Sequence, residues 1–310
     1  EPYGAFPTKR SKIWTGFARS ISGKRRALPA FRQRTFRFCL SIWNITAKEN
    51  KRPRLREGHD AMDDLKSRFD EWLREHRLAL SENQWNMFET YYRELIDWNE
   101  KMNLTGITER EQVYVKHFYD SLTLSFFVPM ENVVTVADIG SGAGFPGVPL
   151  KIAFPHIKLT VIDSLNKRIR FLVHLVEKLQ LANVDCVHAR AEDAARQPGL
   201  RDAFDLVTAR AVARLNVLNE LCLPFVKVGG LFAAMKGTDP SDEIGEAAFS
   251  LRQLKGETVE VRRLELPVDR AERHIVLIRK LAQTPKTYPR KAGTPLKNPL
   301  TNRNVPRETF

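Results

Sequence analysis

The sequence predicts an α/β protein in which helices precede a doubly wound, mostly parallel sheet of seven strands. From residue 133 onward, short β-branched segments alternate with amphipathic segments, as in successive right-handed βαβ units. The first of these segments ends in a turn that contains Gly140, Gly142 and Gly144. Glycines at this point let the backbone turn sharply and approach a ligand closely, so we expect a nucleotide-type site there.

The basic charge of the chain is concentrated at its two ends. The formal net charge of the 310 residues is +13, with 43% hydrophobic and 28% charged residues, a composition typical of globular proteins. Residues 1–61 hold 15 Lys and Arg against 4 Asp and Glu, and residues 279–310 hold 8 against 1, so the part between is mildly acidic. This distribution predicts a polyanionic partner that contacts the ends of the chain.

The cysteines and the hydropathy pattern predict a cytoplasmic protein. Cys39, Cys186 and Cys222 show no metal-ligand or redox spacing, so we expect reduced thiols and no metal site. No apolar stretch approaches the roughly 20 residues that cross a bilayer.

Residues 1–61 are rich in Arg, Lys, Ser and Pro and show no sustained helical or strand periodicity. They could form a transit peptide, a nucleic-acid-binding arm, or upstream sequence ahead of a true start at Met62. We favour the last interpretation, because an amphipathic helix begins directly at Met62. Residues 1–61 are therefore predicted to be a basic, disordered leader or an upstream extension.

Residues 62–128 are predicted to form a helical cap. Ser81 and Gln84 have the spacing of a capping box, and a stripe of aromatic residues follows at helical spacing. Such a stripe is more often core than a platform for stacking bases. Two short helices are expected at 109–117 and 119–127, and the lone His117 beside aromatic residues is more simply explained as structural than as catalytic.

Residues 129–281 are predicted to form the sheet domain, followed by a basic, Pro-rich and extended tail at 282–310. The short link between the last two strands predicts an antiparallel hairpin at one edge of the sheet. The expected strands are 133–138, 158–163, 184–188, 204–208, 230–235, 258–265 and 273–280, and the expected helices are 147–154, 165–180, 212–226 and 240–255.

Polar residues follow successive strands, at the edge of the sheet where ligands bind in doubly wound folds. They are Asp138, Asp163, Ala191 with Glu192, Arg210 with Arg214, and Lys236. A single acid at such a position is commonly a helix cap. Three acids at consecutive strand ends favour a ligand site.

The glycine turn is formally compatible with a dinucleotide cofactor, because Gly142, Gly144 and Gly147 have the dinucleotide spacing. Two residues argue against an NAD oxidoreductase. Pro146 removes an N–H that would face a pyrophosphate, and Asp138 would repel phosphate but attract a cation. S-adenosylmethionine, which carries a sulfonium and no phosphate, fits better. Asp163 is then suited to a ribose diol, and Ala191 and Glu192 to the adenine.

The residues after the fourth strand narrow the choice of methyl acceptor. The segment at 209–211 lacks the Asn/Asp-Pro-Pro-aromatic signature of adenine amino methyltransferases. Cys222 lies in an apolar helix and is a poor candidate for the nucleophile of a C5-pyrimidine enzyme. An acceptor with an available lone pair, such as guanine N7, needs only positioning and a favourable field, so no catalytic residue is expected. Arg210 and Arg214 could hold the base or a phosphate.

Several of these motifs together resemble the bacterial guanine-N7 methyltransferases of small-subunit (16S) rRNA, the glucose-inhibited-division-B family. The resemblance spans about residues 62–300, and its most distinctive parts are the Gly-Phe-Pro-Gly turn and the Tyr-Pro-Arg tail. The matching stretches are Asn103–Ile107, His117–Leu122, Asp138–Gly147, Asp163–Arg168, Arg190–Glu192, Phe204–Ala213 and Tyr288–Pro295.

The resemblance implies a Rossmann-like class I S-adenosylmethionine-dependent fold and methylation of a guanine in the decoding region of 16S rRNA. By motif it implies cofactor contacts at Gly140, Phe145, Ala191, Glu192 and Arg210, to which the chemistry above adds Asp138, Gly142 and Asp163.

The expected partner is 16S rRNA or the small ribosomal subunit, bound by a monomer. The alternatives are a small-molecule methyltransferase and a non-catalytic RNA-binding assembly factor on the same fold.

Overall fold

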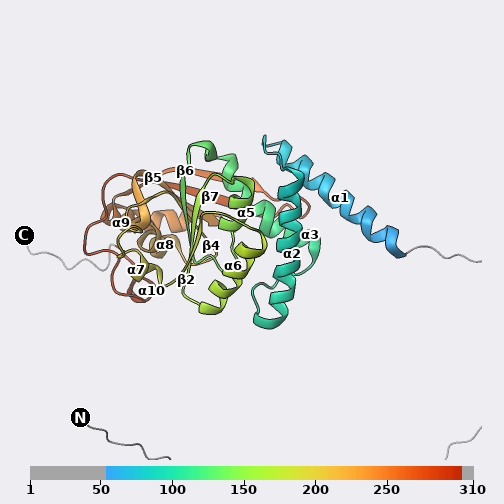
Figure 1. The fold of residues 1–310 in the computed structure, drawn as a ribbon. Coiled ribbons are helices and arrows are strands. Elements are labelled where there is room, and N and C mark those ends of the chain that lie inside the picture. The colour runs from blue at the N-terminus through green and yellow to red at the C-terminus, as the bar shows by residue number, and fades with distance from the viewer. Residues whose placement is uncertain (1–53, 302–310) are drawn as a thin grey trace, which may run out of the picture. The chain divides into compact units, whose positions relative to one another are not determined.

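The computed structural model describes residues 54–301, and their side chains from residue 64 onward. The expectations for residues 1–53 and 302–310 lie outside this range. The fold is built on a seven-stranded sheet in the order β3-β2-β1-β4-β5-β7-β6. Figure 1 shows this sheet with helices packed around it. The strands are β1 (Thr135–Ile139), β2 (Lys158–Asp163), β3 (Val184–His188), β4 (Phe204–Arg210), β5 (Val226–Lys236), β6 (Gly256–Glu265) and β7 (Glu272–Lys280).

The strand pairing confirms the predicted topology. Strands β1 to β5 pair in parallel, whereas β7 pairs antiparallel with both β5 and β6. The hairpin of β6 and β7 therefore closes one edge of the sheet, as the short link between them predicts. Because the order reverses at β1 and β4, the carboxyl ends of these two strands flank the switch point at which ligands bind in open α/β sheets.

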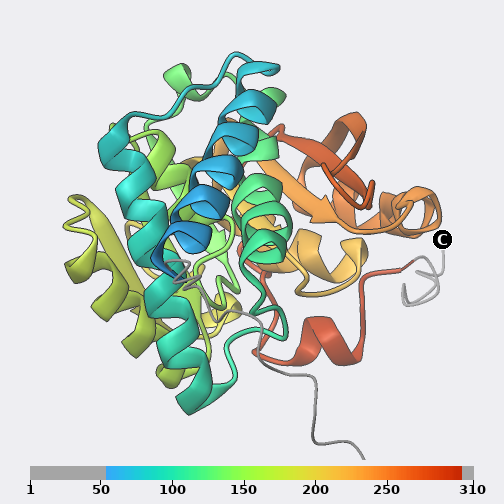
Figure 2. The same ribbon diagram turned by 90° about the vertical axis from the view of Figure 1, so that its right-hand side faces the viewer.

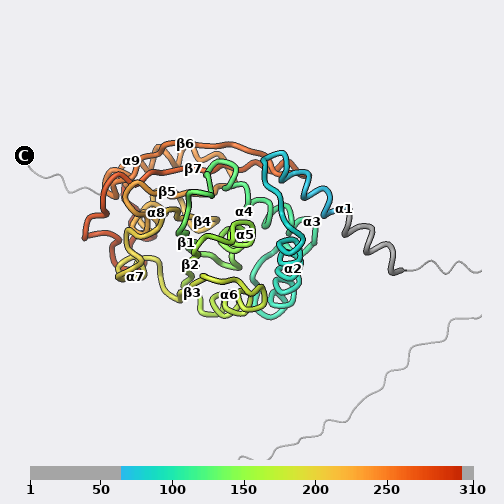
Figure 3. The backbone as a smooth tube through the Cα atoms, turned by 45° about the horizontal axis from the view of Figure 1, so that its top comes forward, coloured from blue at the N-terminus to red at the C-terminus, as the bar shows by residue number. Residues whose placement is uncertain are grey.

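Helices cover both faces of the sheet and enclose two hydrophobic cores. In Figure 3, α5 and α6 lie on one side of the strands together with α2, and α7, α8 and α9 lie on the other. The first core includes the cap helices and the second includes the buried Cys222. The helices after the first strand are α5 (Gly147–Ala153), α6 (Asn166–Lys178), α7 (Ala191–Ala194), α8 (Leu215–Cys222), α9 (Ser241–Leu254) and α10 (Thr294–Lys297).

The helical cap starts with α1 (Arg54–Arg74), which begins ahead of Met62, and α2 (Glu82–Met102). Figure 2 looks onto this part of the molecule, with α1 and α2 in front. Ser81 and Gln84 form the expected capping box at the start of α2. Phe69 and Phe88 are fully buried and pack against each other, so the aromatic stripe is core, as predicted.

The two short helices expected after α2 are joined into one composite helix. It runs through α3 (Arg110–Val113), the π-helical η1 (Tyr114–Tyr119), α4 (Asp120–Leu122) and the 3-10 turn η2 (Thr123–Phe126). A second 3-10 turn, η3 (Met130–Asn132), leads into β1, and η4 (Leu223–Phe225) leads into β5. Single π-helical turns inside helices often occur at functional sites, and this one carries Lys116 and His117.

The tail is folded back onto the domain as far as residue 301, so the expectation of an extended tail is wrong for this part. Leu300 is buried in the second core. Arg201 donates hydrogen bonds to the carbonyl oxygens of Thr284, Pro285 and Tyr288. Between residues 282 and 301 the tail contains only the short helix α10, as its prolines favour. The contacts of Arg201 hold the rest of the segment against the domain. Among the described residues, no helix is both long and apolar enough to cross a membrane.

Candidate functional site: two adjoining cavities

The glycine turn after β1 has a backbone that only glycine accommodates at two of its positions. Gly140 and Gly144 have φ angles of +71° and +101°. A Cβ atom on Gly140 would lie 2.7 Å from Val212 Cγ2, and one on Gly144 would lie 2.6 Å from the hydroxyl of Tyr91. Both a left-handed conformation and close neighbours therefore require glycine here.

Asp138 lies behind this turn and is fully buried. Its Oδ2 atom accepts hydrogen bonds from Ser141 Oγ at 2.5 Å and from the Gly147 amide at 3.0 Å. Burial is the main cause that raises the pKa of Asp138 to about 6, against the lowering effect of these two hydrogen bonds. Asp138 therefore holds the turn through these two hydrogen bonds. The attraction of its charge for a cationic ligand stays a prediction.

The surroundings of Asp138 fit a cationic ligand better than a phosphate. The Gly147 amide is the first N–H of α5, and Asp138 already occupies it, while Pro146 before it has no N–H. Asp138 Oδ1 is buried and receives no hydrogen bond within residues 54–301, so its charge is only partly compensated. A negative potential at the turn favours a positive group nearby.

The first cavity, which we call the Asp163 cavity, has a volume of about 280 Å³. Four of the expected cofactor contacts line it, namely Gly140, Asp163, Ala191 and Glu192. The other lining residues are Ile139, Ile162, Ser164, Arg168, Ala189, Arg190, Ala211, Val212, Ala213, Leu221 and Leu296. The structure therefore brings together the ends of β1, β2 and β3, as the sequence predicts.

Asp163 is held in place at the end of β2 by backbone amides. Its Oδ2 atom accepts a hydrogen bond from the Gly142 amide at 3.0 Å, and its Oδ1 atom accepts one from Leu165 at 2.8 Å. Gly142 does not line the cavity and contributes by orienting this carboxylate. Arg168 Nη1 also donates to Oδ2 at 3.3 Å. A carboxylate has about four lone-pair sites, so Asp163 retains capacity to accept about one hydrogen bond from a hydroxyl group of a ligand.

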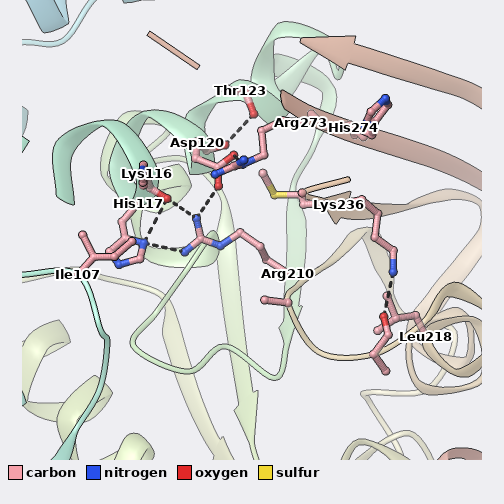
Figure 4. A pocket seen from close by; sticks show the side chains of 15 residues that line it. Ile107, Lys116, His117, Asp120, Thr123, Arg210, Leu218, Lys236, Arg273 and His274 are labelled. Carbon is pink, nitrogen blue, oxygen red and sulfur yellow. Dashed lines mark hydrogen bonds and ion pairs between the residues drawn. The ribbon is translucent and has the colours of Figure 1, made fainter. Parts of the chain in front are cut away.

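The second cavity, which we call the Arg210 cavity, has a volume of about 350 Å³ and is rich in basic side chains (Figure 4). Figure 4 shows Arg210, Asp120 and Arg273 converging at one side of it. Its lining residues are Ile107, Lys116, His117, Asp120, Thr123, Arg210, Ala211, Ala213, Leu218, Met235, Lys236, Gly237, Arg273, His274 and Ile275.

Asp120 joins two arginines that come from different parts of the chain. Its Oδ2 atom lies 2.9 Å from Nη1 of Arg210 on β4, and its Oδ1 atom lies 3.2 Å from Nε of Arg273 on β7. Asp120 is buried, so its charge is compensated mainly by these two partners. Lys116 forms an ion pair with Asp269, and Lys236 forms one with Glu243.

Phe145 lies in a stack of rings that connects the cap to the glycine turn. Its ring stacks on Tyr91 at 5.3 Å on one side and on His117 at 4.6 Å on the other. The guanidinium of Arg210 lies 5.0 Å from the centre of the Phe145 ring. Phe145 is buried in this stack and lines neither cavity, so its contact with a cofactor stays a prediction.

His117 is held neutral by its surroundings. Burial, and then the positive charge of Arg210, lower the pKa of His117 to about 3. Its Nε2 atom lies 2.8 Å from Thr105 Oγ1. The imidazole is therefore uncharged at neutral pH and serves as a packing and hydrogen-bonding group at the wall of the Arg210 cavity.

The sequence reasoning missed Asp120 and Arg273, and it grouped Arg214 with Arg210. Arg273 lies far along the chain from Asp120, and only the pairing of β7 with β5 brings it to the site. Arg214 instead points toward α9, where its side chain forms an exposed ion pair with Glu246 at 2.9 Å. One sequence signal could have identified Asp120. It lies four residues after Lys116, and helical spacing places such residues on neighbouring turns of one helix face.

The two cavities adjoin. Both are lined by Ala211 and Ala213, which follow β4 at the switch point of the sheet. Ala211 has a φ of +56°, an uncommon value for a residue other than glycine. The two cavities therefore meet at a point where the shared side chains are short.

Solved structures resemble this chain only loosely. One is the crystal structure of M. jannaschii TYW2 in complex with AdoMet, with 17% sequence identity and a TM-score of 0.40, covering 52% of this chain and 74% of that one. Another is a precorrin-6y C5,15-methyltransferase from Geobacter metallireducens, with 16% identity and a TM-score of 0.39, covering 52% of this chain and 87% of that one.

Sequence relatives are much nearer. Ribosomal RNA small subunit methyltransferase G of Brevibacillus brevis is 53% identical over 235 residues, which cover 76% of this chain and 99% of the relative. The protein of the same name from Bacillus thuringiensis is 52% identical over 232 residues, covering 75% and 97%. The family model described as rRNA small subunit methyltransferase G matches residues 84–276. These matches confirm the resemblance seen in the motifs, and the chain belongs to the rRNA small subunit methyltransferase G family.

Proposed function

We propose that this chain transfers a methyl group from S-adenosylmethionine to N7 of a guanine in 16S rRNA. The observation that carries the proposal is the pair of adjoining cavities at the switch point of the sheet, which share Ala211 and Ala213. One cavity offers carboxylates to a nucleoside, and the other offers cations to a polyanion. The names of the relatives support rRNA of the small subunit as the substrate.

The Asp163 cavity fits the cofactor. Asp163 and Glu192 would hold the ribose and the adenine, and apolar residues such as Ile162 and Leu221 would contact the flat faces of the nucleoside. The partly compensated charge of Asp138 favours a cationic ligand at the glycine turn. When bound, S-adenosylmethionine supplies an electrophilic methyl group on its sulfonium.

The Arg210 cavity fits the acceptor nucleotide. Lys116, Arg210, Lys236 and Arg273 line it together with Asp120. Asp269 and Glu243 pair with the two lysines, so the four cations exceed their three carboxylate partners by one. Arginines bind phosphate through paired N–H donors, and an arginine that donates to guanine O6 alone would leave the N7 lone pair free to accept the methyl group. An excess of cations would also attract the RNA over a distance.

No proton acceptor is required of the protein. Guanine N7 carries a lone pair in the plane of the base and no proton, so the chain has to orient the base and stabilise the charge that develops. The pKa of about 3 makes His117 a poor base. This agrees with a site that works by positioning.

We propose a cytoplasmic monomer as the working form, with the small ribosomal subunit or its RNA as the partner. The domain division stays a prediction, with a leader or upstream extension to residue 61, a helical cap over 62–128 and a cofactor-binding domain over 129–281. Because α1 begins at Arg54, we place the start of the cap there.

The proposal is tested by mapping N7-methylguanine in rRNA from cells with and without this chain, and by methyl transfer with the purified protein. We expect one guanine of 16S rRNA to lose its methyl group in cells that lack the chain. Unchanged rRNA together with methylation of a small molecule would favour the small-molecule enzyme. Binding of RNA without any methyl transfer would favour the assembly factor.

A further inference from the structure

The segment at residues 288–298, which we call the C-terminal strap, is fixed to the domain by an ion pair and by carbonyl contacts. Arg290 donates to the carboxylate of Glu220 from its backbone amide at 2.7 Å, from Nε at 2.9 and 3.1 Å, and from Nη2 at 2.7 Å. Glu220 lies on α8 and is fully buried. Arg196 donates a hydrogen bond to the carbonyl oxygen of Pro289. A charged pair with one member buried gives the strap a defined position.

The strap meets the Asp163 cavity at two points. The Gly293 amide donates a hydrogen bond to Glu192 Oε1 at 2.8 Å. Three residues further along, Leu296 lines the cavity. Leu296 is 68% exposed, which makes it the most exposed of the large hydrophobic side chains in the described part of the chain. An exposed leucine at the mouth of a cavity gains free energy when a ligand covers it.

We propose that the C-terminal strap is the outer wall of the cofactor pocket, and that Leu296 packs on the adenosine part of S-adenosylmethionine. The identity of the ligand rests on the function proposed above. The adenosine end is assigned because the strap binds Glu192, which follows Ala191 at the end of β3. Leu296 would then cover the nucleoside from the side opposite the sheet.

This role differs from the one that the basic composition of the tail suggests. Arg290, the central basic residue of the Tyr-Pro-Arg motif, is committed to Glu220 and to the carbonyl oxygen of Asn298. It therefore positions the strap and is not free to contact phosphates. The strap adds the C-terminal segment to a pocket otherwise built from strand ends.

The first test measures the affinity of the purified full chain for S-adenosylmethionine by calorimetry. We expect Leu296→Ser to raise the Kd about fivefold to tenfold, since partial burial of a leucine side chain is lost. Leu281→Ser is the matched control, because Leu281 is also an exposed leucine, at 54%, and lies outside the cavity. Equal Kd values for both variants and the wild type would overturn the role of Leu296.

The second test uses limited trypsin digestion of the wild-type chain with and without S-adenosylhomocysteine. Lys297 and Lys286 are both exposed, and only Lys297 lies in the strap. We expect the ligand to slow cleavage after Lys297 several-fold and to leave cleavage after Lys286 unchanged. Unchanged cleavage after Lys297 in the ligand-saturated protein would contradict the proposal.

The strap proposal and the proposed function would be contradicted by different results. If the wild-type chain binds S-adenosylmethionine and the two leucine variants behave alike, the strap proposal is wrong and the proposed function stands. If the wild-type chain binds no S-adenosylmethionine at millimolar concentration, the proposed function is wrong and the strap proposal falls with it.

Discussion

Tyr91 donates a hydrogen bond from its hydroxyl to the carbonyl oxygen of Ala143 at 2.5 Å, and so ties helix α2 to the glycine turn. Both residues are buried. The cap therefore directly supports the backbone that forms the cofactor site.

Tyr91→Phe should lower the free energy of unfolding by about 1–3 kcal/mol, because a buried carbonyl oxygen loses its partner. The stack on Phe145 would remain, so the cofactor affinity should fall only in part. Tyr92→Phe is the control, since the Tyr92 hydroxyl makes only a long contact of 3.4 Å with Thr108. Urea denaturation and calorimetric titration measure the two effects, and equal stability of both variants would contradict the prediction.

Asp120→Asn should reduce methyl transfer at least about tenfold, because Arg210 and Arg273 would lose the charge that holds them together. Asp269→Asn removes the partner of Lys116, an ion pair with both side chains about one-third exposed, and should change the rate little. Steady-state kinetics with rRNA distinguish the two. An Asp120→Asn enzyme with wild-type kcat and KM would show that the bridge has no positioning role.

The buried carboxyl of Asp138 should make the protein less stable as the pH rises from about 4 to about 6. Its pKa in the folded state is raised to about 6, mainly by burial, so in this window the folded state binds the proton more tightly than the unfolded chain. A pKa difference of about 2 corresponds to about 3 kcal/mol. Asp138→Asn should remove this dependence, and denaturation at a series of pH values measures it.

His117 should act in the opposite direction. Because burial lowers its pKa to about 3, the unfolded chain takes up a proton below the ordinary histidine pKa of about 6.5 while the folded state does not. The contribution of His117 to stability is therefore complete above pH 6.5 and is lost as the pH falls toward 3. In His117→Gln the loss of stability between pH 6.5 and 4 should be smaller than in the wild type. An identical pH profile of the variant and the wild type would show that other groups cause the loss of stability at low pH.

The sheet could be predicted from the sequence because the signals that mark its strands are local. Strand β2 and strand β3 have the predicted bounds, and the short link before β7 forces the hairpin at the edge. The glycine spacing and Asp163 likewise marked the edge of the sheet at which the Asp163 cavity lies. Each of these features depends on a few neighbouring residues, so a single sequence contains them.

The features that the sequence did not predict depend on contacts between segments that are distant in the chain. Arg273 reaches Asp120 only because β7 inserts between β5 and β6. The tail reads as extended from its prolines, yet the buried Glu220 on α8 binds Arg290 and folds it back. Asp138 lies near the carboxyl end of β1, where a ligand-binding acid is expected, but its hydrogen bonds turn it toward Ser141 and Gly147.

The short side chains at which the two cavities meet have a consequence for inhibitor design. At Ala211 and Ala213 the side chains that both cavities share end at a methyl group. A single compound that joins an adenosine-like half to a purine-like half would need only a short linker to cross this point. Such a bisubstrate compound would occupy both cavities at once, and its affinity would benefit from the high effective concentration of the second half. Selectivity over other methyltransferases would come from the half placed between Arg210 and Arg273.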